Sequence, residues 1–167
     1  EWEKLGSEEQ KEAIISLRDS IAQELGLSDK PSVQFYNNKD AGDFGGYSPS
    51  ENTIYINEYN MGDAKETADT IAHESRHCWQ HERADSPVTE QDYEFKENFG
   101  DYVRPEDDYR EYRNQPVESD AREYASGIVP NIPVKSDDDR YNTGAVKTNP
   151  GMTENNEVGR SRPNDLE

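Results

Sequence analysis

Residues 64–84 read AKETADTIAHESRHCWQHERA and have the strongest helical character in the chain. Asp63 precedes them and is a suitable N-cap, because a short acceptor side chain can bind the free backbone amides of the first helical turn. Glu66, three residues after Asp63, completes the pattern of a capping box. The middle of the segment favours a buried helix because it is rich in small or apolar residues: Ile71, Ala72, Ser75, Cys78 and Trp79.

A histidine pair lies inside this segment, where residues 73–77 read His-Glu-Ser-Arg-His. Side chains four residues apart lie on the same helix face, so His73 and His77 can reach one Zn²⁺ at about 2.0–2.1 Å. Glu74 lies about 100° further round the helix, where it can reach a metal-bound water but is poorly placed as a ligand. The pattern predicts His73 and His77 as ligands and Glu74 as the general base.

The alternative is that the two histidines bind no metal and lie either on the surface or in the core with their hydrogen bonds satisfied. Against it, the chain has three histidines and all of them fall in this one segment. The third, His81, stands about 6 Å beyond His77 along a helix that rises 1.5 Å per residue, too far to share a metal with both others. We therefore expect His81 to be a surface residue.

A catalytic zinc site needs a third protein ligand and an open position. The best candidate segment is residues 115–125, QPVESDAREYA, in which Pro116 predicts the start of a short helix over about 117–126. Glu118, Ala121 and Ala125 share one face of that helix, whereas Asp120 points about 200° away from Glu118. Glu118 is the predicted third ligand. An acidic residue favoured in a first helical turn by the helix dipole is the alternative.

The remaining pattern predicts an α+β fold. Residues 8–25 have the spacing of an amphipathic helix that ends at Gly26, and the segments Val33–Tyr36 and Thr53–Asn57 have strand character. Together they predict a small antiparallel sheet packed on the metal-binding helix. The polar, aromatic-rich stretch 85–115 predicts one or two short helices over the site.

Composition divides the chain into a domain over residues 1–130 and an irregular C-terminal tail over residues 131–167. The tail is rich in Asn, Asp, Pro, Gly and Thr, and its few apolar residues do not offset the entropy of ordering it unless they dock on the body. We expect a flexible or loosely docked segment.

The chain of 167 residues has a net charge of −19, and residues 1–130 carry 13 basic and 30 acidic side chains, or 13 − 30 = −17. Such a surface repels nucleic acid and anionic membranes and favours a basic substrate or partner protein, although acidity can also serve solubility alone. No apolar stretch is long enough to span a membrane. The chain has no signal peptide and starts at Glu1, so we expect it to come from a longer polypeptide.

Two motifs in this order, ETADTIAHESRHCWQ and QPVESDAREYA, resemble the gluzincin group of zinc peptidases. The likeness is strongest to minigluzincin-like and bacterial toxin-associated metallopeptidase domains and covers about residues 41–126. It implies His73, His77 and Glu118 as zinc ligands, Glu74 as base, and the segment TIYIN at 53–57 as an edge strand that pairs with substrate. Many gluzincins carry an acid four residues after the glutamate ligand; that position is Arg122 here, and Asp120 is the candidate for the same supporting role.

The resemblance also predicts a phenol that stabilises the oxyanion, with Tyr109, Tyr112 and Tyr124 as candidates and Tyr112 as our choice. The function hypothesis is a zinc metalloendopeptidase that cleaves a protein or peptide. We expect it to be secreted or delivered as the cargo domain of a bacterial effector or toxin, with an immunity or inhibitor protein as partner. The alternative is a non-catalytic acidic protein-binding module on a zincin fold, in which an intact Glu74 has no purpose.

Overall fold

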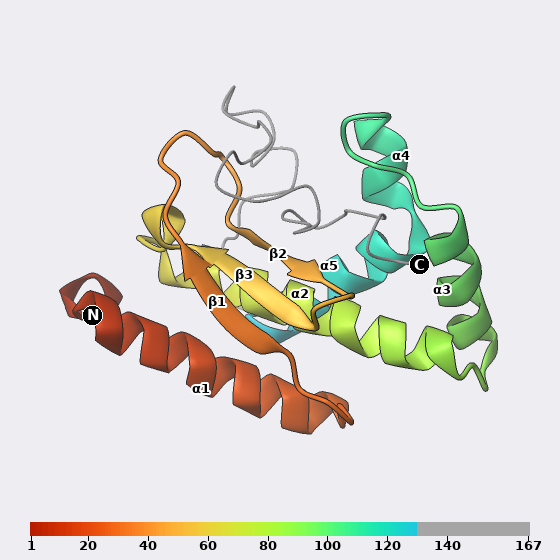
Figure 1. Ribbon diagram of the computed structural model, residues 1–167, viewed down its shortest axis with the longest axis horizontal. Coiled ribbons are helices and arrows are strands. Elements are labelled where there is room, and N and C mark those ends of the chain that lie inside the picture. Colours follow the sequence, from red (N-terminus) through yellow and green to blue (C-terminus); the bar gives the residue numbers. More distant parts are fainter. Residues whose placement is uncertain (130–167) are drawn as a thin grey trace.

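A computed structural model describes residues 1–129 of the chain, and the predicted tail at 131–167 lies outside these residues. The fold is α+β, as predicted, with five α-helices and three strands in the described part (Figure 1). The elements, in chain order, are η1 (Trp2–Lys4), α1 (Ser7–Leu25), β1 (Ser32–Tyr36), β2 (Gly45–Ser48), β3 (Thr53–Asn57), η2 (Glu58–Asn60), α2 (Ala64–Asp85), α3 (Glu90–Gly100), α4 (Tyr109–Asn114) and α5 (Pro116–Ile128).

The sheet is mixed, so the prediction of an antiparallel sheet is wrong. Its strand order is β1-β3-β2, with β1 parallel to β3 and β2 antiparallel to β3. Residues 37–44 carry the chain past the place that β3 later takes, and β2 forms on the far side. A tight turn then brings β3 back between the two earlier strands. The direction of β1 is therefore set by the length of a loop, which the strand sequences do not encode.

The segment TIYIN is the central strand β3, not the edge strand that the resemblance implies. All five of its residues are buried. Its polar side chains find partners on neighbouring loops: the Asn57 amide donates to the carbonyl of Asn38, and the Tyr55 hydroxyl donates to Glu51 at 2.8 Å. Alternation of apolar and polar residues therefore did not mean that one face meets water.

Strand β2 is the edge strand that lies against α2. It begins at Gly45, where a Cβ atom would stand 2.2 Å from the backbone oxygen of Tyr55. No residue with a side chain fits such a close backbone approach without a shift of the strand. Glycine at this position thus lets β2 pair closely with β3.

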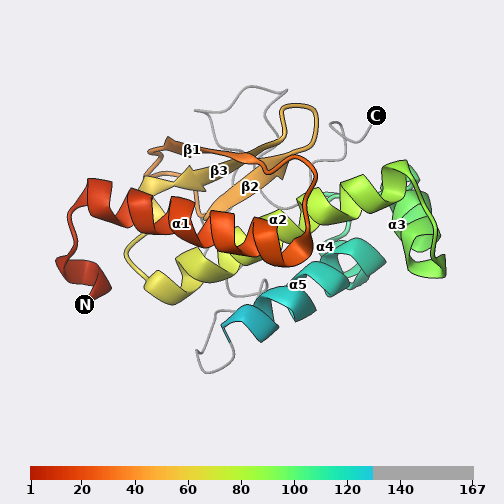
Figure 2. The same ribbon diagram turned by 90° about the horizontal axis from the view of Figure 1, so that it is seen from below.

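Helix α2 forms the centre of the fold, with the sheet on one side and α5 on the other (Figures 1 and 2). Its predicted N-cap is confirmed: the Asp63 carboxylate accepts from the backbone amides of Lys65 and Glu66 at 2.8 and 3.1 Å. The main core lies where α1, α2 and the sheet meet, and it contains Ile14, Ile21, Ile54, Ile56, Ile71 and Ala72. A buried central helix can hold polar groups away from water.

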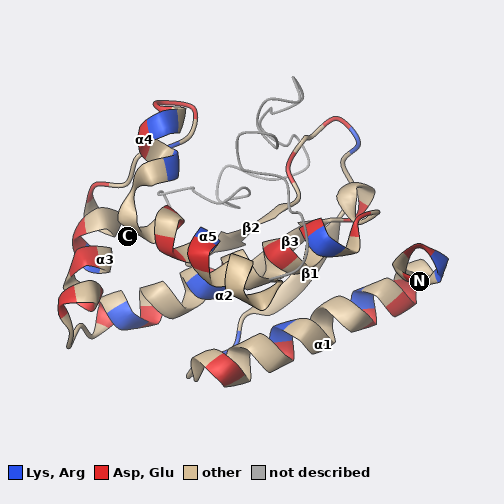
Figure 3. Cartoon of the chain, turned by 180° about the vertical axis from the view of Figure 1, so that it is seen from behind, with Lys and Arg blue, Asp and Glu red and all other residues tan. Residues whose placement is uncertain are grey.

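The stretch 85–115 forms the two helices α3 and α4, as predicted. A second, smaller core of Ala84, Phe95 and Val117 joins α3 to α2 and α5, and Trp79, Phe99 and Tyr102 pack against it. Acidic residues occur along all five helices of the described chain (Figure 3). No helix among residues 1–129 is long and apolar enough to cross a membrane.

Candidate metal centre

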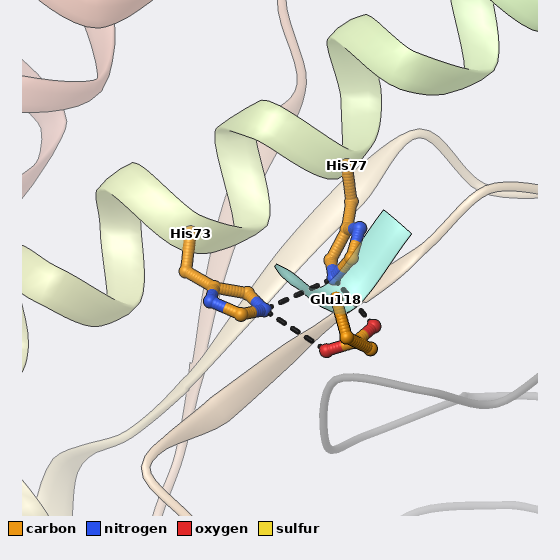
Figure 4. A group of neighbouring side chains, drawn as sticks. All are labelled: His73, His77 and Glu118. Carbon is orange, nitrogen blue, oxygen red and sulfur yellow. Dashed lines mark hydrogen bonds and ion pairs between the residues drawn. The ribbon is translucent and has the colours of Figure 1, made fainter. Parts of the chain in front are cut away.

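Two helices bring together the three residues predicted as metal ligands. His73 and His77 lie one turn apart on α2, and Glu118 reaches them from the first turn of α5 (Figure 4). The Nε2 atoms of the two histidines are 3.1 Å apart, and Glu118 places one oxygen 3.1 Å from His73 and the other 2.9 Å from His77. All three side chains are buried.

These distances fit a single divalent ion. A tetrahedral ion with bonds of about 2.05 Å holds its ligand atoms about 3.3 Å apart. The three separations of 2.9–3.1 Å are close to that value. Two imidazole nitrogens and a carboxylate oxygen are also a donor set that first-row divalent metals bind well. Residues His73, His77 and Glu118 can therefore hold a metal ion.

Close packing of α5 on α2 makes this meeting possible. Ala121 and Ala125 are fully buried on the face of α5 that carries Glu118. Pro116 occupies the start of α5, where its missing amide costs no hydrogen bond and its φ angle suits the helix. Small side chains between the two helices thus let the Glu118 carboxylate reach the histidines.

The centre favours positive charge. Burial alone lowers the pKa of His77, but the charge and hydrogen bond of Glu118 outweigh it, and the charge of Glu74 adds to them. The net result is a His77 pKa raised to about 9. A group of buried carboxylates that holds a proton this tightly also attracts a divalent cation.

Two tyrosines donate hydrogen bonds to the Glu118 carboxylate. The Tyr112 hydroxyl donates to one Glu118 oxygen at 3.0 Å, and the Tyr102 hydroxyl donates to the other at 2.9 Å. Tyr112, the predicted oxyanion stabiliser, is thus at the centre and in contact with a predicted ligand. Of the other two candidates, Tyr109 packs on the Tyr112 ring and Tyr124 lies 4.9 Å from the Arg76 guanidinium.

The hydrogen bond from Tyr102 to Glu118 was not predicted from the sequence. The residue lies in an irregular segment between α3 and α4, where no periodicity predicts the direction of a side chain. Its aromatic character was visible, but its contact with Glu118 depends on how α3 packs on α5.

Glu74, the predicted base, lies on α2 and is fully buried. The charge of the Glu74 carboxylate acts on His77 and helps to raise the pKa of that ring. The structure therefore brings together the predicted base, the three predicted ligands and the predicted phenol.

Asp120 supports the centre indirectly. It accepts hydrogen bonds from the Arg76 guanidinium at 2.8 and 3.0 Å and from the Gln80 amide at 2.7 Å. Gln80 in turn contacts the Nδ1 atom of His77 at 2.8 Å. Asp120 points away from Glu118, as an ideal helix requires, and the long side chains of α2 reach across to it. Gln80, three residues after His77, was not predicted, although residues three apart share a helix face.

His81, predicted to be a surface residue, is half-buried: one part of it is exposed and its ring is packed against other rings. Its ring stacks on Phe99 with 3.9 Å between centroids and 13° between planes, and it lies 6.0 Å from the Tyr47 ring. Burial, and then the charge of His77, lowers the His81 pKa to about 3. The helical position faces outward from α2, but α3 and β2 cover it. His81 is not part of the described metal cluster, as its position along the helix predicts.

Comparisons of the chain with protein-family models, with curated proteins and with solved structures give no match. Evidence for a function therefore comes from the two motifs and from the geometry of the centre. The gluzincin resemblance remains a hypothesis that the motifs carry.

Proposed function

We propose that this protein is a zinc metallopeptidase that hydrolyses peptide bonds. The observation that carries the proposal is the convergence of His73, His77 and Glu118, with a buried Glu74 beside them. Two histidines, one carboxylate and an open fourth position are typical of catalytic zinc sites in peptidases. Zinc is the metal of this proposal because it prefers this ligand number and geometry.

The proposed chemistry assigns a separate task to each side chain. His73, His77 and Glu118 would hold the zinc ion, which would supply acidification of a water molecule and polarisation of the substrate carbonyl. Glu74 accepts the proton of the attacking water and passes it to the leaving amine. We assign Tyr112 to the developing oxyanion: its single hydroxyl proton, which it donates to Glu118 in the structure, would turn from that carboxylate to the oxyanion.

Substrate binding in this proposal uses β2. An extended peptide can add to the outer strand of a sheet through main-chain hydrogen bonds, and β2 is the outer strand beside α2. Glu74, Glu118 and the four residues of β2 are buried. The reaction therefore requires an opening movement that admits the substrate.

The proposed substrate is a protein or peptide, and the net charge of −17 over residues 1–130 favours a basic one. We keep the setting of a secreted or delivered effector, with an immunity or inhibitor protein as partner, as part of this proposal. An inhibitor with a basic face would match the many acidic residues along the helices, which are coloured red in Figure 3.

A non-catalytic, acidic protein-binding module is the second candidate. Full burial of His73, Glu74 and Glu118 favours it, since a structural metal site is closed to solvent. In that case the metal joins α2 to α5, and the acidic surface binds the partner. A buried carboxylate at Glu74 that binds no metal is the feature this candidate does not explain.

Zinc analysis and peptide cleavage separate the two candidates. We expect one zinc per chain by elemental analysis and new peptide termini by mass spectrometry after incubation with a proteome-derived peptide library. Glu74→Gln is expected to keep the zinc and to lower the cleavage rate by about 10²–10⁴-fold. Glu94→Gln removes the same charge at an exposed position of α3 and serves as the control.

Each outcome decides one question. Zinc bound without cleavage of any peptide favours the binding module. Cleavage that Glu74→Gln leaves unchanged refutes the assigned base. A chain that binds no divalent metal refutes the proposed function as a whole.

A further inference from the structure

A buried glutamine follows the metal-binding pair by one helical turn. Gln80 has no exposed surface, and its side-chain oxygen lies 2.8 Å from Nδ1 of His77. This is the ring nitrogen that faces away from the cluster, because Nε2 of His77 faces His73 and Glu118. Gln80 is thus the outer neighbour of a predicted ligand.

The partners of Gln80 determine which way its amide is oriented. Its Nε2 atom lies 2.9 Å from the backbone oxygen of Val117 and 2.7 Å from a carboxylate oxygen of Asp120. Both partners accept hydrogen bonds, so the amide NH₂ group, with two protons to donate, must face them. The amide oxygen then faces His77 and can only accept.

This orientation determines the tautomer of His77. An acceptor at Nδ1 requires that Nδ1 carry the proton. In the neutral ring, Nε2 then has a free lone pair directed at the cluster, which is the form that binds a metal. In metal sites such an outer partner fixes the orientation of the ring and raises its basicity.

Asp120 is itself held in place by an arginine of α2. The Arg76 guanidinium binds both of its oxygens, at 2.8 and 3.0 Å. Arg76 also lies over the Trp79 ring, 3.8 Å from the centroid. The network therefore runs from Arg76 through Asp120 and Gln80 to His77, and it joins α2 to α5 on the way.

We propose that Gln80 is a positioning residue for the metal, which holds His77 in the tautomer and ring orientation that ligation requires. Asp120, paired with Arg76, keeps the Gln80 amide in the required orientation. The inference rests on the proposed metal centre and adds a determinant of its affinity. A purely structural link between α2 and α5 would use the same contacts with Val117 and Asp120, so the test has to separate the two roles.

The test measures zinc affinity of the full chain by competition with a chromophoric chelator, together with the melting temperature without metal. Gln80→Leu removes the acceptor and is expected to weaken zinc binding by about 10–100-fold. Gln80→Glu keeps an acceptor for the Nδ1 proton but faces Asp120 with a second carboxylate. We expect it to lower the melting temperature while zinc affinity stays within about threefold of the original.

A matched control is Asn57→Leu, which removes another fully buried amide. Asn57 binds the backbone of Asn38, Asp43 and Tyr59. This variant is expected to lower the melting temperature without changing zinc affinity, because it touches the sheet and its loops. A spectroscopic readout completes the set: the nitrogen NMR spectrum of the zinc-loaded chain should show the His77 proton on Nδ1.

The outcomes distinguish this inference from the proposed function. Equal zinc affinity in Gln80→Leu and the original chain, or a His77 proton on Nε2, overturns the role of Gln80 while the metal centre stands. Weakened affinity in Gln80→Leu with recovery in Gln80→Glu supports it, even if no peptide is cleaved. Absence of zinc binding in the original chain overturns both.

Discussion

Two histidines one turn apart on α2 have opposite electrostatic properties. His77 faces the Glu118 carboxylate, and its pKa is raised to about 9. His81 packs between the rings of Phe99 and Tyr47, and its pKa is lowered to about 3. Burial is the largest single influence on both, and it disfavours the charged ring in both.

The difference comes from what α5 and α3 place against each turn of the helix. Glu118 on α5 brings a charge and a hydrogen bond to His77, whereas Phe99 on α3 brings an apolar ring to His81. A buried imidazole keeps its proton to higher pH where a buried carboxylate stands beside it. The side chain that packs against each turn of α2 therefore decides whether the pKa of its histidine rises or falls.

Glu118→Ala is expected to have the largest effect, because it removes the carboxylate that distinguishes His77 from His81. One of three ligands is lost, so zinc affinity should fall by more than about 100-fold, beyond the effect of removing an outer partner. The pKa of His77 should fall below about 9, since Glu118 is the main group that raises it. Chelator competition and an NMR titration of the His77 ring measure the two effects. Glu123→Ala, at an exposed position on α5, is the control, and equal losses in both variants would contradict the assignment.

The pH dependence of the metal-free chain tests His77 itself. Its pKa of about 9 in the folded state lies above the ordinary value of 6.5, so its stabilising effect is complete below pH 6.5 and is lost as the pH rises through 9. We expect the free energy of unfolding to fall by about 2 kcal/mol between pH 7 and pH 9. Urea unfolding with a chelator present measures it. His77→Gln should remove most of this dependence, and a chain as stable at pH 9 as at pH 7 would refute the raised pKa.

His81→Phe tests the lowered pKa of His81. In the unfolded chain His81 takes up a proton near pH 6.5, while in the folded chain its pKa is about 3. The original chain therefore loses stability as the pH falls below 6.5, by about 1–2 kcal/mol at pH 5. Phenylalanine keeps a ring against Phe99 and cannot be protonated. Parallel acid-unfolding curves for the two chains would refute the lowered pKa of His81.

Asp43→Asn tests the effect of burial on a charged group that has no charged partner. Burial raises the pKa of Asp43 to about 6, against hydrogen bonds from the Tyr36 hydroxyl and the backbone. Its ordinary pKa is 3.8, so the folded state loses stability as the pH rises from about 4 to 6. Asp43→Asn should raise the free energy of unfolding by about 3 kcal/mol at pH 7.5 and by well under about 1 kcal/mol at pH 4. Asp40→Asn, at an exposed site, is the control, and equal gains in both would exclude burial as the cause.

The helix α2 and its two histidines could be predicted because their signals are local. Asp63 caps the helix through amides two and three residues away, and His73 and His77 share a face because a helix turns once in 3.6 residues. Glu118 was also predictable, since Ala121 and Ala125 mark the face of α5 that can approach another helix. Each of these inferences needs only the geometry of one helix.

Other features depended on distant parts of the chain. The direction of β1 and the central place of β3 follow from the path of residues 37–44. The cover over His81 comes from α3 and β2. The contact between Tyr102 and Glu118 comes from an irregular segment. No periodicity in the sequence encodes how such pieces meet.

By itself the sequence determined the α+β class, the shared face of His73 and His77 on α2 and the choice of Glu118 as the third predicted ligand, because helical periodicity places side chains by spacing alone. Tertiary structure alone decided the order and directions of the strands, the opposite properties of His77 and His81, and the path from Arg76 through Asp120 to Gln80. These features depend on contacts between segments far apart in the chain. Burial and neighbouring charges act on a side chain through its neighbours in space, within a few ångströms, and the sequence alone does not show which residues those are.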